Sequence, residues 1–193
     1  MKKLPTLFTD VSWKINEIKP NSNIYLIENF LSDIECDKIM KSEWDLKSGG
    51  VYSSDGNSYV DEYYRKCSAL SIDIPTLKQK ISNLVNWPID KSESCVLMHY
   101  KVGDFFKPHS DYIDHLPDDV NRNATLILYL NTPEKGGETI FPSRQIKVPA
   151  IKGNALFYNY TADRKEMHAG CRIKEGEKWI ITQWFREKDY INK

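Results

Sequence analysis

Two histidines and two aspartates lie within eleven residues, in the segment FFKPHSDYIDH at positions 105 to 115. Imidazole and carboxylate groups at this density are typical of a metal site. In an extended chain residues i and i+2 share a face, so His109 and Asp111 can reach one ion together. Asp114 and His115 continue into the polar stretch DHLPDDVNRN, which predicts a solvated loop. We therefore expect the first pair, and not His115, to bind the metal.

A third ligand must come from elsewhere in the chain, where the remaining histidines are His99 and His168. His168 lies in EMHAGC, a candidate strand far downstream. Two histidines and one carboxylate on one face are the ligand set of non-haem Fe(II) sites, which leaves positions open on the metal. Zinc hydrolases use the same ligand types, so the ligands alone do not choose between the metals. Histidines that are only hydrogen-bonded in the core remain a third interpretation.

The segment KWIITQWFRE near the C-terminus predicts a strand with two distinct faces. One face carries Lys178, Ile180, Thr182 and Trp184. A lysine among apolar residues in a buried strand needs an anionic partner, and a dicarboxylate cosubstrate would supply one. The simpler interpretation is a surface lysine at the start of the strand.

Two amphipathic helices are predicted in the N-terminal half. Ser32 and Glu35 have the spacing of a capping box, and apolar residues at helical intervals extend this helix from about 32 to 44. Pro75 begins PTLKQKISNLVNW, whose apolar residues fall on one stripe, and Trp87 with the proline after it should end the helix. Both helices need an apolar surface to pack against.

From residue 94 onward the pattern changes to short runs of β-branched and aromatic residues. The runs are SCVLMHYK, ATLILYLN, ETIF, QIKVP, NALFYNY, EMHAGCRI and KWIITQWFRE. Two helices followed by seven or eight strands predict a mainly β fold, a sandwich or barrel whose sheet is backed by the helices. The metal ligands would lie inside its mouth.

The composition limits the classes of function. A chain of 193 residues with 40% hydrophobic and 28% charged residues fits a single soluble domain. Its 27 basic and 27 acidic residues balance, which gives no overall field toward nucleic acid or a membrane. The four cysteines form no CxxC pair, which argues against a zinc cluster or a disulfide framework. Without a signal peptide or a membrane-length apolar segment, we expect a cytoplasmic protein.

A series of segments resembles the 2-oxoglutarate-dependent Fe(II) oxygenases, and within them the prolyl 4-hydroxylases. They are HYKVGDFFKPHSDY, ATLILYLNTPEKGGETIFP, KGNALFYNY, HAGCRIKEGEKW and TQW, in this order. The resemblance runs from about Ile24 to Arg186 and implies a double-stranded β-helix, or jelly roll. We expect this core, at about 94 to 187, to pack against N-terminal α-helices that provide support over about 1 to 93, within one domain of residues 1 to 193.

The resemblance also implies roles for individual residues. The implied Fe(II) ligands are His109, Asp111 and His168. The residues expected to hold 2-oxoglutarate are Lys178, which would pair with its distal carboxylate, Tyr100, Thr139 and, from its place on the Lys178 face, Thr182. The residues expected near the substrate are Arg122 and Trp184. The segment 48 to 66 would be mobile and fold over a bound peptide.

The implied reaction is hydroxylation of an unactivated C–H bond, with 2-oxoglutarate and O₂ consumed and succinate and CO₂ released. The favoured substrate is a proline residue in a protein or peptide, hydroxylated at C4; ascorbate is left open as an additional reductant. Phe106 stands where related enzymes often carry tyrosine, which puts the substrate in doubt more than the chemistry.

Two alternatives to the favoured reaction stay open. One is a hydroxylase of free proline or another small molecule, and the other is a metal-free β-barrel binding module. Nucleic-acid demethylation fits poorly, because the charge is balanced and Lys178 stands where paired arginines would be expected. The sequence leaves the oligomeric state undetermined.

Overall fold

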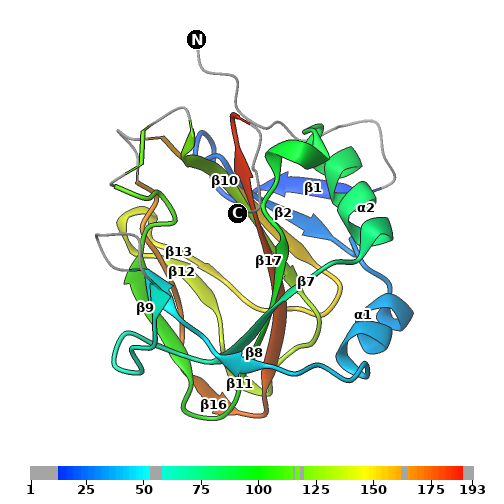
Figure 1. Cartoon of the computed structure of the whole chain (residues 1–193), viewed down its shortest axis with the longest axis vertical. Helices are drawn as coiled ribbons and strands as arrows, with labels where there is room; N and C mark the ends of the chain where they lie inside the picture. Colours follow the sequence, from blue (N-terminus) through cyan, green and yellow to red (C-terminus); the bar gives the residue numbers. More distant parts are fainter. Residues whose placement is uncertain (1–12, 53–57, 115, 118–119, 162–164, 189–193) are drawn as a thin grey trace.

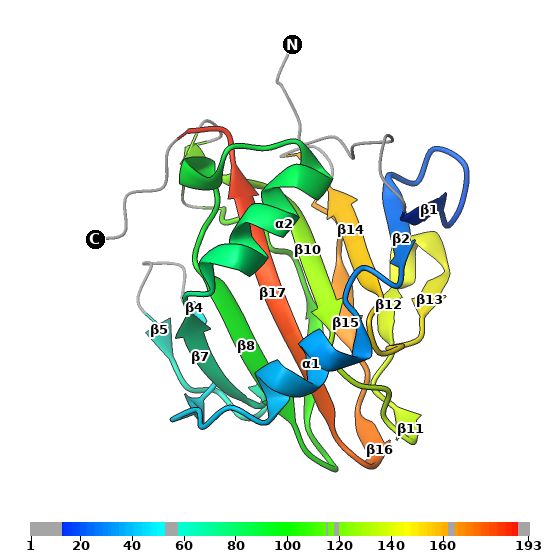
Figure 2. The same cartoon turned by 90° about the vertical axis from the view of Figure 1, so that its right-hand side faces the viewer.

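The computed structural model describes residues 13–52, 58–114, 116–117, 120–161 and 165–188 (Figure 1). Within them, two antiparallel sheets enclose the interior and two helices lie on the outer face of the larger sheet (Figure 2). The mainly β fold that the sequence predicts is confirmed.

The larger sheet has eight strands. In spatial order they are β1 (Lys14–Glu17), β2 (Ile24–Glu28), β14 (Ala155–Asn159), β10 (Arg122–Tyr129), β17 (Lys178–Arg186), β8 (Cys95–Tyr100), β7 (Ser68–Ile72) and β3 (Lys47–Ser48). The N-terminal region therefore contributes four strands to this sheet, although its sequence predicts mainly helical support. β1 and β3 are short and largely exposed, so they lack the apolar alternation that identifies a strand.

The smaller sheet has five strands and carries the chemistry-bearing segments. In spatial order they are β13 (Ile146–Val148), β12 (Thr139–Phe141), β15 (His168–Gly170), β9 (Phe105–His109) and β6 (Arg65–Lys66). Two further pairs are β11 (Lys135–Gly136) with β16 (Ile173–Glu175), and β4 (Val51–Tyr52) with β5 (Ser58–Tyr59). The β9–β15 register sets His168 directly opposite His109.

The helices α1 (Asp33–Met40) and α2 (Pro75–Val85) differ slightly from their predicted lengths. The capping box at Ser32 forms as predicted, but α1 ends well before residue 44. Trp44 instead folds back, and its Nε1 donates to the Ile39 carbonyl at 2.7 Å. Two single-turn 3₁₀ helices span Ile89–Lys91 and Pro142–Arg144. Among the described residues, no helix is long and apolar enough to cross a membrane.

The two faces of the larger sheet bury separate apolar clusters. The outer cluster joins α1 and α2 to the sheet, and the inner cluster lies between the two sheets. β17 supplies Ile181 and Phe185 to the outer cluster and Ile180 to the inner one, with Trp184 packed against it. The predicted division of this strand into two faces is confirmed, and Lys178 begins the strand on the inner side.

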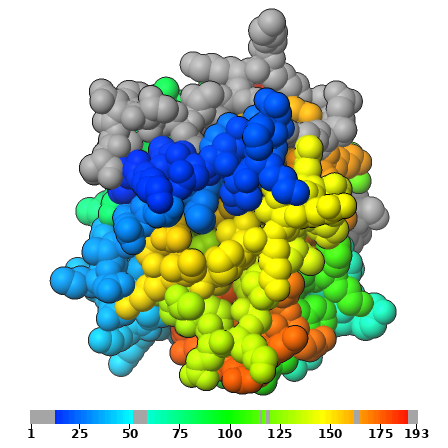
Figure 3. Space-filling model, turned by 180° about the vertical axis from the view of Figure 1, so that it is seen from behind, coloured from blue at the N-terminus to red at the C-terminus, as the bar shows by residue number. Residues whose placement is uncertain are grey.

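The back of the molecule is closed by a contact between segments far apart in sequence. Figure 3 shows the N-terminal strands, in blue, lying beside the segment that contains β13, in yellow. Lys19 Nζ donates to the Arg144 carbonyl at 2.8 Å, which connects the β1–β2 turn to this segment. The interior between the sheets is therefore covered on this side.

Candidate metal centre

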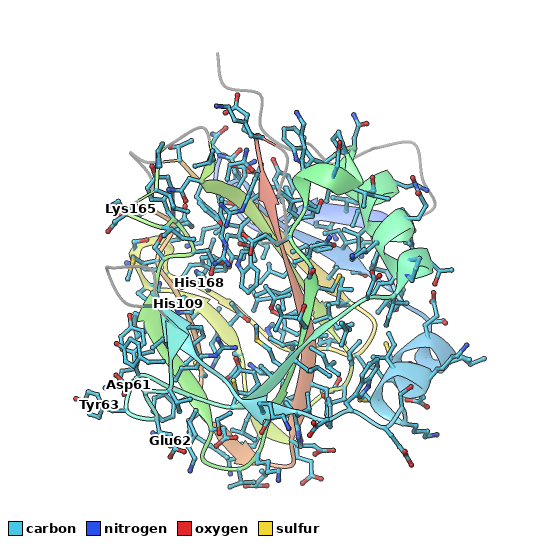
Figure 4. The ribbon with its side chains drawn as sticks, in the orientation of Figure 1. Asp61, Glu62, Tyr63, His109, Lys165 and His168 are labelled. Carbon is cyan, nitrogen blue, oxygen red and sulfur yellow. The ribbon has the colours of Figure 1, made fainter. Side chains whose placement is uncertain are left out.

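His109, Asp111 and His168 lie together, and Figure 4 shows the two histidines close to each other in the interior. Each offers one ligand atom, and these atoms lie within 4.8 Å of one another. His109 Nε2 is 3.9 Å from Asp111 Oδ1, and His168 Nε2 is 3.5 Å from Asp111 Oδ2. The structure thus brings together the three residues that the sequence singles out. Asp114 is exposed and pairs with Lys165 at 2.5 Å, and His115 lies outside the described residues.

Backbone carbonyls fix both histidine rings. His109 Nδ1 lies 2.8 Å from the Lys107 carbonyl, and His168 Nδ1 lies 3.1 Å from the Glu166 carbonyl. Because a carbonyl only accepts, each Nδ1 carries the hydrogen, and each Nε2 keeps a lone pair for a metal. Burial, with a smaller effect of the His168 charge, lowers the pKa of His109 to about 3. This imidazole is therefore neutral at physiological pH.

Asp111 supplies the negative charge of the centre. Burial raises the pKa of this carboxyl, but His168, His109, Arg122 and the Thr125 hydroxyl together outweigh burial and hold the pKa below its ordinary value. The group is therefore a carboxylate at neutral pH. Two imidazoles, each with Nδ1 held by a backbone carbonyl, and one carboxylate match the requirements of a divalent metal with open coordination positions.

Buried hydroxyl groups surround the same carboxylate, and the sequence does not predict their positions. Thr125 Oγ1 donates to Asp111 Oδ2 at 2.7 Å, and the Tyr158 hydroxyl donates to the same oxygen at 3.0 Å. Tyr160 OH lies 3.0 Å from Thr125 Oγ1. The alternation in NALFYNY places both tyrosines on one face of a strand, but no sequence signal connects that face to Asp111.

The three ligands open into a pocket that extends to Lys178. Four of its lining residues, Lys178, Tyr100, Thr139 and Thr182, are the ones expected to hold the cosubstrate, and they are here called the lysine end. The three ligands form its metal end. Met98, Phe106 and Ile180 are among the residues that line the pocket between them. All four residues expected to hold the cosubstrate thus share one pocket with the metal ligands.

Lys178 is only 2% exposed, so the simpler interpretation of a surface lysine is wrong. Its Nζ donates to the Gly137 carbonyl at 2.9 Å and lies 4.6 Å from the centre of the Tyr100 ring. The described part of the chain places no carboxylate in an ion pair with Nζ. Burial lowers the pKa of Lys178 to about 8. An ammonium group held in this way is suited to an anion from outside the chain.

The hydroxyl groups of the lysine end have weak or shared partners. Tyr100 OH and Thr182 Oγ1 lie 3.6 and 4.0 Å from the Met98 sulfur, which is a poor acceptor, and Tyr100 OH also contacts the side chains of Arg65 and Cys67. Thr139 Oγ1 lies 2.9 Å from the Tyr129 hydroxyl. Burial raises the pKa of Tyr100, so its hydroxyl stays a donor. These groups can donate to a stronger acceptor that enters the pocket.

The two residues expected near the substrate occupy different positions. Trp184 lines the pocket, and its buried Nε1 has no hydrogen-bond partner among the described residues. Arg122 does not line the pocket: it binds Glu93 through Nε at 2.6 Å and through Nη2 at 2.8 Å. Arg186 pairs with the same carboxylate at 2.6 Å. Arg122 instead lies 3.9 Å from the Trp184 ring, so it supports the ring that faces the pocket.

The described parts of the segment 48 to 66 lie beside strand β9, which ends at His109. It contains β4, β5 and β6, while 53–57 lie outside the described residues. Figure 4 shows Asp61, Glu62 and Tyr63 on the same side of the molecule as His109. Tyr64 OH donates to the Pro108 carbonyl at 2.9 Å, directly before the first ligand. The segment is therefore attached to the strand that presents the metal site.

Phe106 packs against the first ligand. Its ring stacks on the His109 imidazole with 3.5 Å between centroids and an angle of 17°. On strand β6, Arg65 lies 4.8 Å from the same phenyl ring, and its Nη1 donates to the Gly50 carbonyl at 2.8 Å. Phe106, which stands where related enzymes often carry tyrosine, therefore packs on the His109 imidazole and contacts Arg65 of the 48 to 66 segment.

Comparison with known proteins assigns this arrangement to a family. Residues 95–186 match the family model described as the 2OG-Fe(II) oxygenase superfamily. The chain is 30% identical over 219 residues to probable prolyl 4-hydroxylase 7 of Arabidopsis thaliana, which covers 96% of this chain and 67% of the relative. It is 29% identical over 223 residues to probable prolyl 4-hydroxylase 6 of the same plant, with 98% and 75% covered.

A solved structure agrees with these relatives. The viral collagen prolyl hydroxylase of Paramecium bursaria Chlorella virus-1, in its 2-oxoglutarate complex, superposes with a TM-score of 0.66 at 27% identity and covers 90% of this chain and all of that one. The chain belongs to the 2-oxoglutarate- and Fe(II)-dependent oxygenases. Within that superfamily it is similar to the prolyl 4-hydroxylases. The family decides between the two metals in favour of iron.

Proposed function

We propose that this chain is a prolyl 4-hydroxylase that acts on proline residues in a protein or a flexible peptide. The observation that carries the proposal is one pocket that joins a His-Asp-His cluster to a buried lysine with no carboxylate in an ion pair among the described residues. The relatives that match most of the chain are prolyl 4-hydroxylases. Two facing antiparallel sheets support the expected jelly roll, and one sheet that contains both N-terminal and C-terminal strands supports a single domain.

His109 Nε2, Asp111 and His168 Nε2 would hold Fe(II). Bound with 2-oxoglutarate and O₂, the iron supplies the oxidation of an unactivated C–H bond, with succinate and CO₂ as coproducts. The chain holds the two imidazoles in the ligating tautomer through the Lys107 and Glu166 carbonyls. Because the site is buried, it also excludes bulk water from the reacting groups.

Lys178 would pair with the distal carboxylate of 2-oxoglutarate. An anion beside Nζ favours the ammonium form and reverses the effect of burial on its pKa. Tyr100, Thr139 and Thr182 would add hydroxyl donors at the same end of the pocket. A dicarboxylate thus satisfies a charge and several donors that the chain leaves with weak partners.

The substrate would enter at the metal end, between Trp184 and the 48 to 66 segment. Trp184 Nε1 offers a donor that lacks a partner among the described residues. Tyr63 exposes 79% of its surface on the same side of the molecule, which suits contact with an extended chain. Arg122 is proposed to act by supporting Trp184, because its own guanidinium is engaged by Glu93.

The test is succinate release against a panel of proline-containing peptides, free proline and methylated oligonucleotides, with mass spectrometry of each product. We expect proline-rich peptides to stimulate succinate release above the uncoupled background and to gain one oxygen on proline. Free proline should not stimulate it. Stimulation by free proline alone would instead support the small-molecule hydroxylase. A wild-type chain that contains no iron after purification and binds no added Fe(II) would support the binding module.

A further inference from the structure

Three buried hydroxyl groups converge on one oxygen of Asp111, two of them directly and the third through another hydroxyl. Thr125 and Tyr158 are fully buried, and Tyr160 is 1% exposed. Thr125 and Tyr158 lie on β10 and β14 of the larger sheet and Tyr160 directly follows β14, whereas Asp111 follows β9 of the smaller sheet. These hydroxyl groups therefore connect the two sheets at the metal end.

The direction of each hydrogen bond follows from counting hydrogens. A threonine hydroxyl carries one hydrogen, and Thr125 directs it to Asp111 Oδ2 at 2.7 Å. The contact of 3.0 Å between Tyr160 OH and Thr125 Oγ1 must then be a donation by Tyr160. The order is Tyr160 to Thr125 to Asp111, and donors in such a series polarise one another.

The Tyr158 hydroxyl lies between two ligands. It is 3.0 Å from Asp111 Oδ2 and 2.9 Å from His168 Nε2. His168 carries its ring hydrogen on Nδ1, so Nε2 can only accept, and the single hydrogen of Tyr158 has two competing acceptors. Once a metal takes the Nε2 lone pair, Oδ2 is the acceptor that remains.

The two oxygens of Asp111 thus have different surroundings. Oδ2 receives two hydroxyl donors and lies 3.5 Å from His168 Nε2, whereas Oδ1 receives neither hydroxyl and faces His109 Nε2 at 3.9 Å. A carboxylate oxygen occupied by two donors is a poorer metal ligand than its neighbour, and a carboxylate held by two donors cannot turn. This geometry favours one-oxygen binding by Asp111, which preserves open positions on the metal for the cosubstrate.

We propose that Tyr158 and Thr125 are positioning residues that restrict Asp111 to binding the metal through Oδ1. The proposal rests on the proposed function only in taking His109, Asp111 and His168 as the metal ligands. The Tyr158 hydroxyl has a second role. In the metal-free chain it can donate to His168 Nε2 or to Asp111 Oδ2, and when the metal occupies Nε2 it donates to Asp111 alone.

The experiment uses Tyr158→Phe and Thr125→Val, which remove one hydroxyl each at nearly constant volume. Thr125→Ser retains the donor, and Tyr25→Phe makes the same chemical change on β2, where the ring packs on the outer cluster. Fe(II) affinity is measured anaerobically by competition with a chelator. The charge-transfer band of the Fe(II)–2-oxoglutarate complex and the melting temperature of the metal-free chain are recorded in parallel.

We expect Fe(II) affinity to fall by about 10–100-fold in Tyr158→Phe and in Thr125→Val, the range for loss of a partner that orients a metal ligand. The charge-transfer band should shift or weaken, while Thr125→Ser and Tyr25→Phe match the wild type. The double variant should lose less than the two single losses combined, because both donors act on one oxygen.

Equal or tighter Fe(II) binding by both single variants, with an unchanged band, would overturn the proposal. A fall in affinity that only follows a fall in melting temperature would also overturn it, because a general loss of packing would then explain the result. Failure of the proposed function is a separate outcome: the wild-type chain itself would bind no Fe(II), or would bind it and hydroxylate no proline.

Discussion

The metal end and the lysine end of the pocket are both buried, yet their polar groups are satisfied in opposite ways. At the metal end, Asp111 Oδ2 receives two hydroxyl donors and each histidine donates to a backbone carbonyl. At the lysine end, the ammonium of Lys178 meets one carbonyl, and Tyr100 faces a thioether sulfur.

This difference suits the two ends to different ligands, a metal ion at one and an anion at the other. The metal end is assembled before its ligand arrives, so it should bind its ion with little rearrangement. The lysine end holds an excess of donors and a cation, so it is completed only by an anion.

Replacing a ligand should have the largest effect. His168→Ala removes one of the two nitrogen ligands, and we expect turnover to fall to the background of the uncatalysed assay with loss of stoichiometric iron. Iron content of the purified variant and succinate release measure this. Because the site is assembled by backbone and hydroxyl contacts, the melting temperature of the metal-free variant should stay close to that of the wild type. Full activity in His168→Ala would remove it from the ligand set.

Lys178→Ala should weaken 2-oxoglutarate binding at the lysine end and leave Fe(II) binding at the metal end unchanged. Removing one partner of a buried ion pair costs ~3–5 kcal/mol, and ~1.4 kcal/mol corresponds to tenfold, so 2-oxoglutarate should bind roughly two to three orders of magnitude more weakly. Lys178→Arg keeps the charge with a different shape and should lose less. Iron affinity should hardly change in either variant. A 2-oxoglutarate titration followed by the charge-transfer band is the measurement, and an unchanged dissociation constant would place the carboxylate elsewhere.

The pH dependence should distinguish the ends more finely. The ammonium form of Lys178 binds the anion, and burial lowers the pKa of this group to about 8 in the chain without cosubstrate. The ammonium fraction therefore falls as pH rises above about 8, and 2-oxoglutarate affinity should fall with it, by at most about tenfold per pH unit. In Lys178→Arg this dependence should disappear, because arginine stays charged. Titrations between pH 7 and 9.5 measure both; a flat wild-type profile would contradict the assignment.

Asp114→Asn should have the smallest effect. Asp114 is close in sequence to the ligands, but it is exposed and pairs with Lys165 on the surface. Exposed pairs contribute ~0–1 kcal/mol to stability. Iron affinity and turnover should match the wild type, and chelator competition beside the His168→Ala variant checks this. A marked loss of iron would mean that the metal end extends into the loop.

The local spacing of residues predicts the candidate site better than it predicts the surroundings of the site. The i and i+2 spacing places His109 and Asp111 on one side, and the alternation of β17 places Lys178 on the pocket face. Both follow from the geometry of a single strand. The pairing of Arg122 with Glu93 does not, because it depends on which strands become neighbours.

The same limit applies to the fold. The long central strands and both helices follow from periodic apolar residues, whereas β1, β3 and β6 have too few residues to show a period. Tyr158 illustrates the limit within the site: its strand is predicted, but its hydroxyl reaches Asp111 only because two sheets face each other. Contacts between sheets depend on the assembled fold, so the local spacing of residues does not predict them.

The register of β9 against β15 gives the metal a role in folding. His109 and His168 are direct cross-strand neighbours although they lie far apart in the sequence, and a slip of one residue would turn one of them to the other side of the sheet. Non-local pairings of this kind form slowly, because a long loop must close first. Fe(II) can therefore bind tightly only after this pairing is correct. The ion would select correctly paired chains by mass action and slow their unfolding.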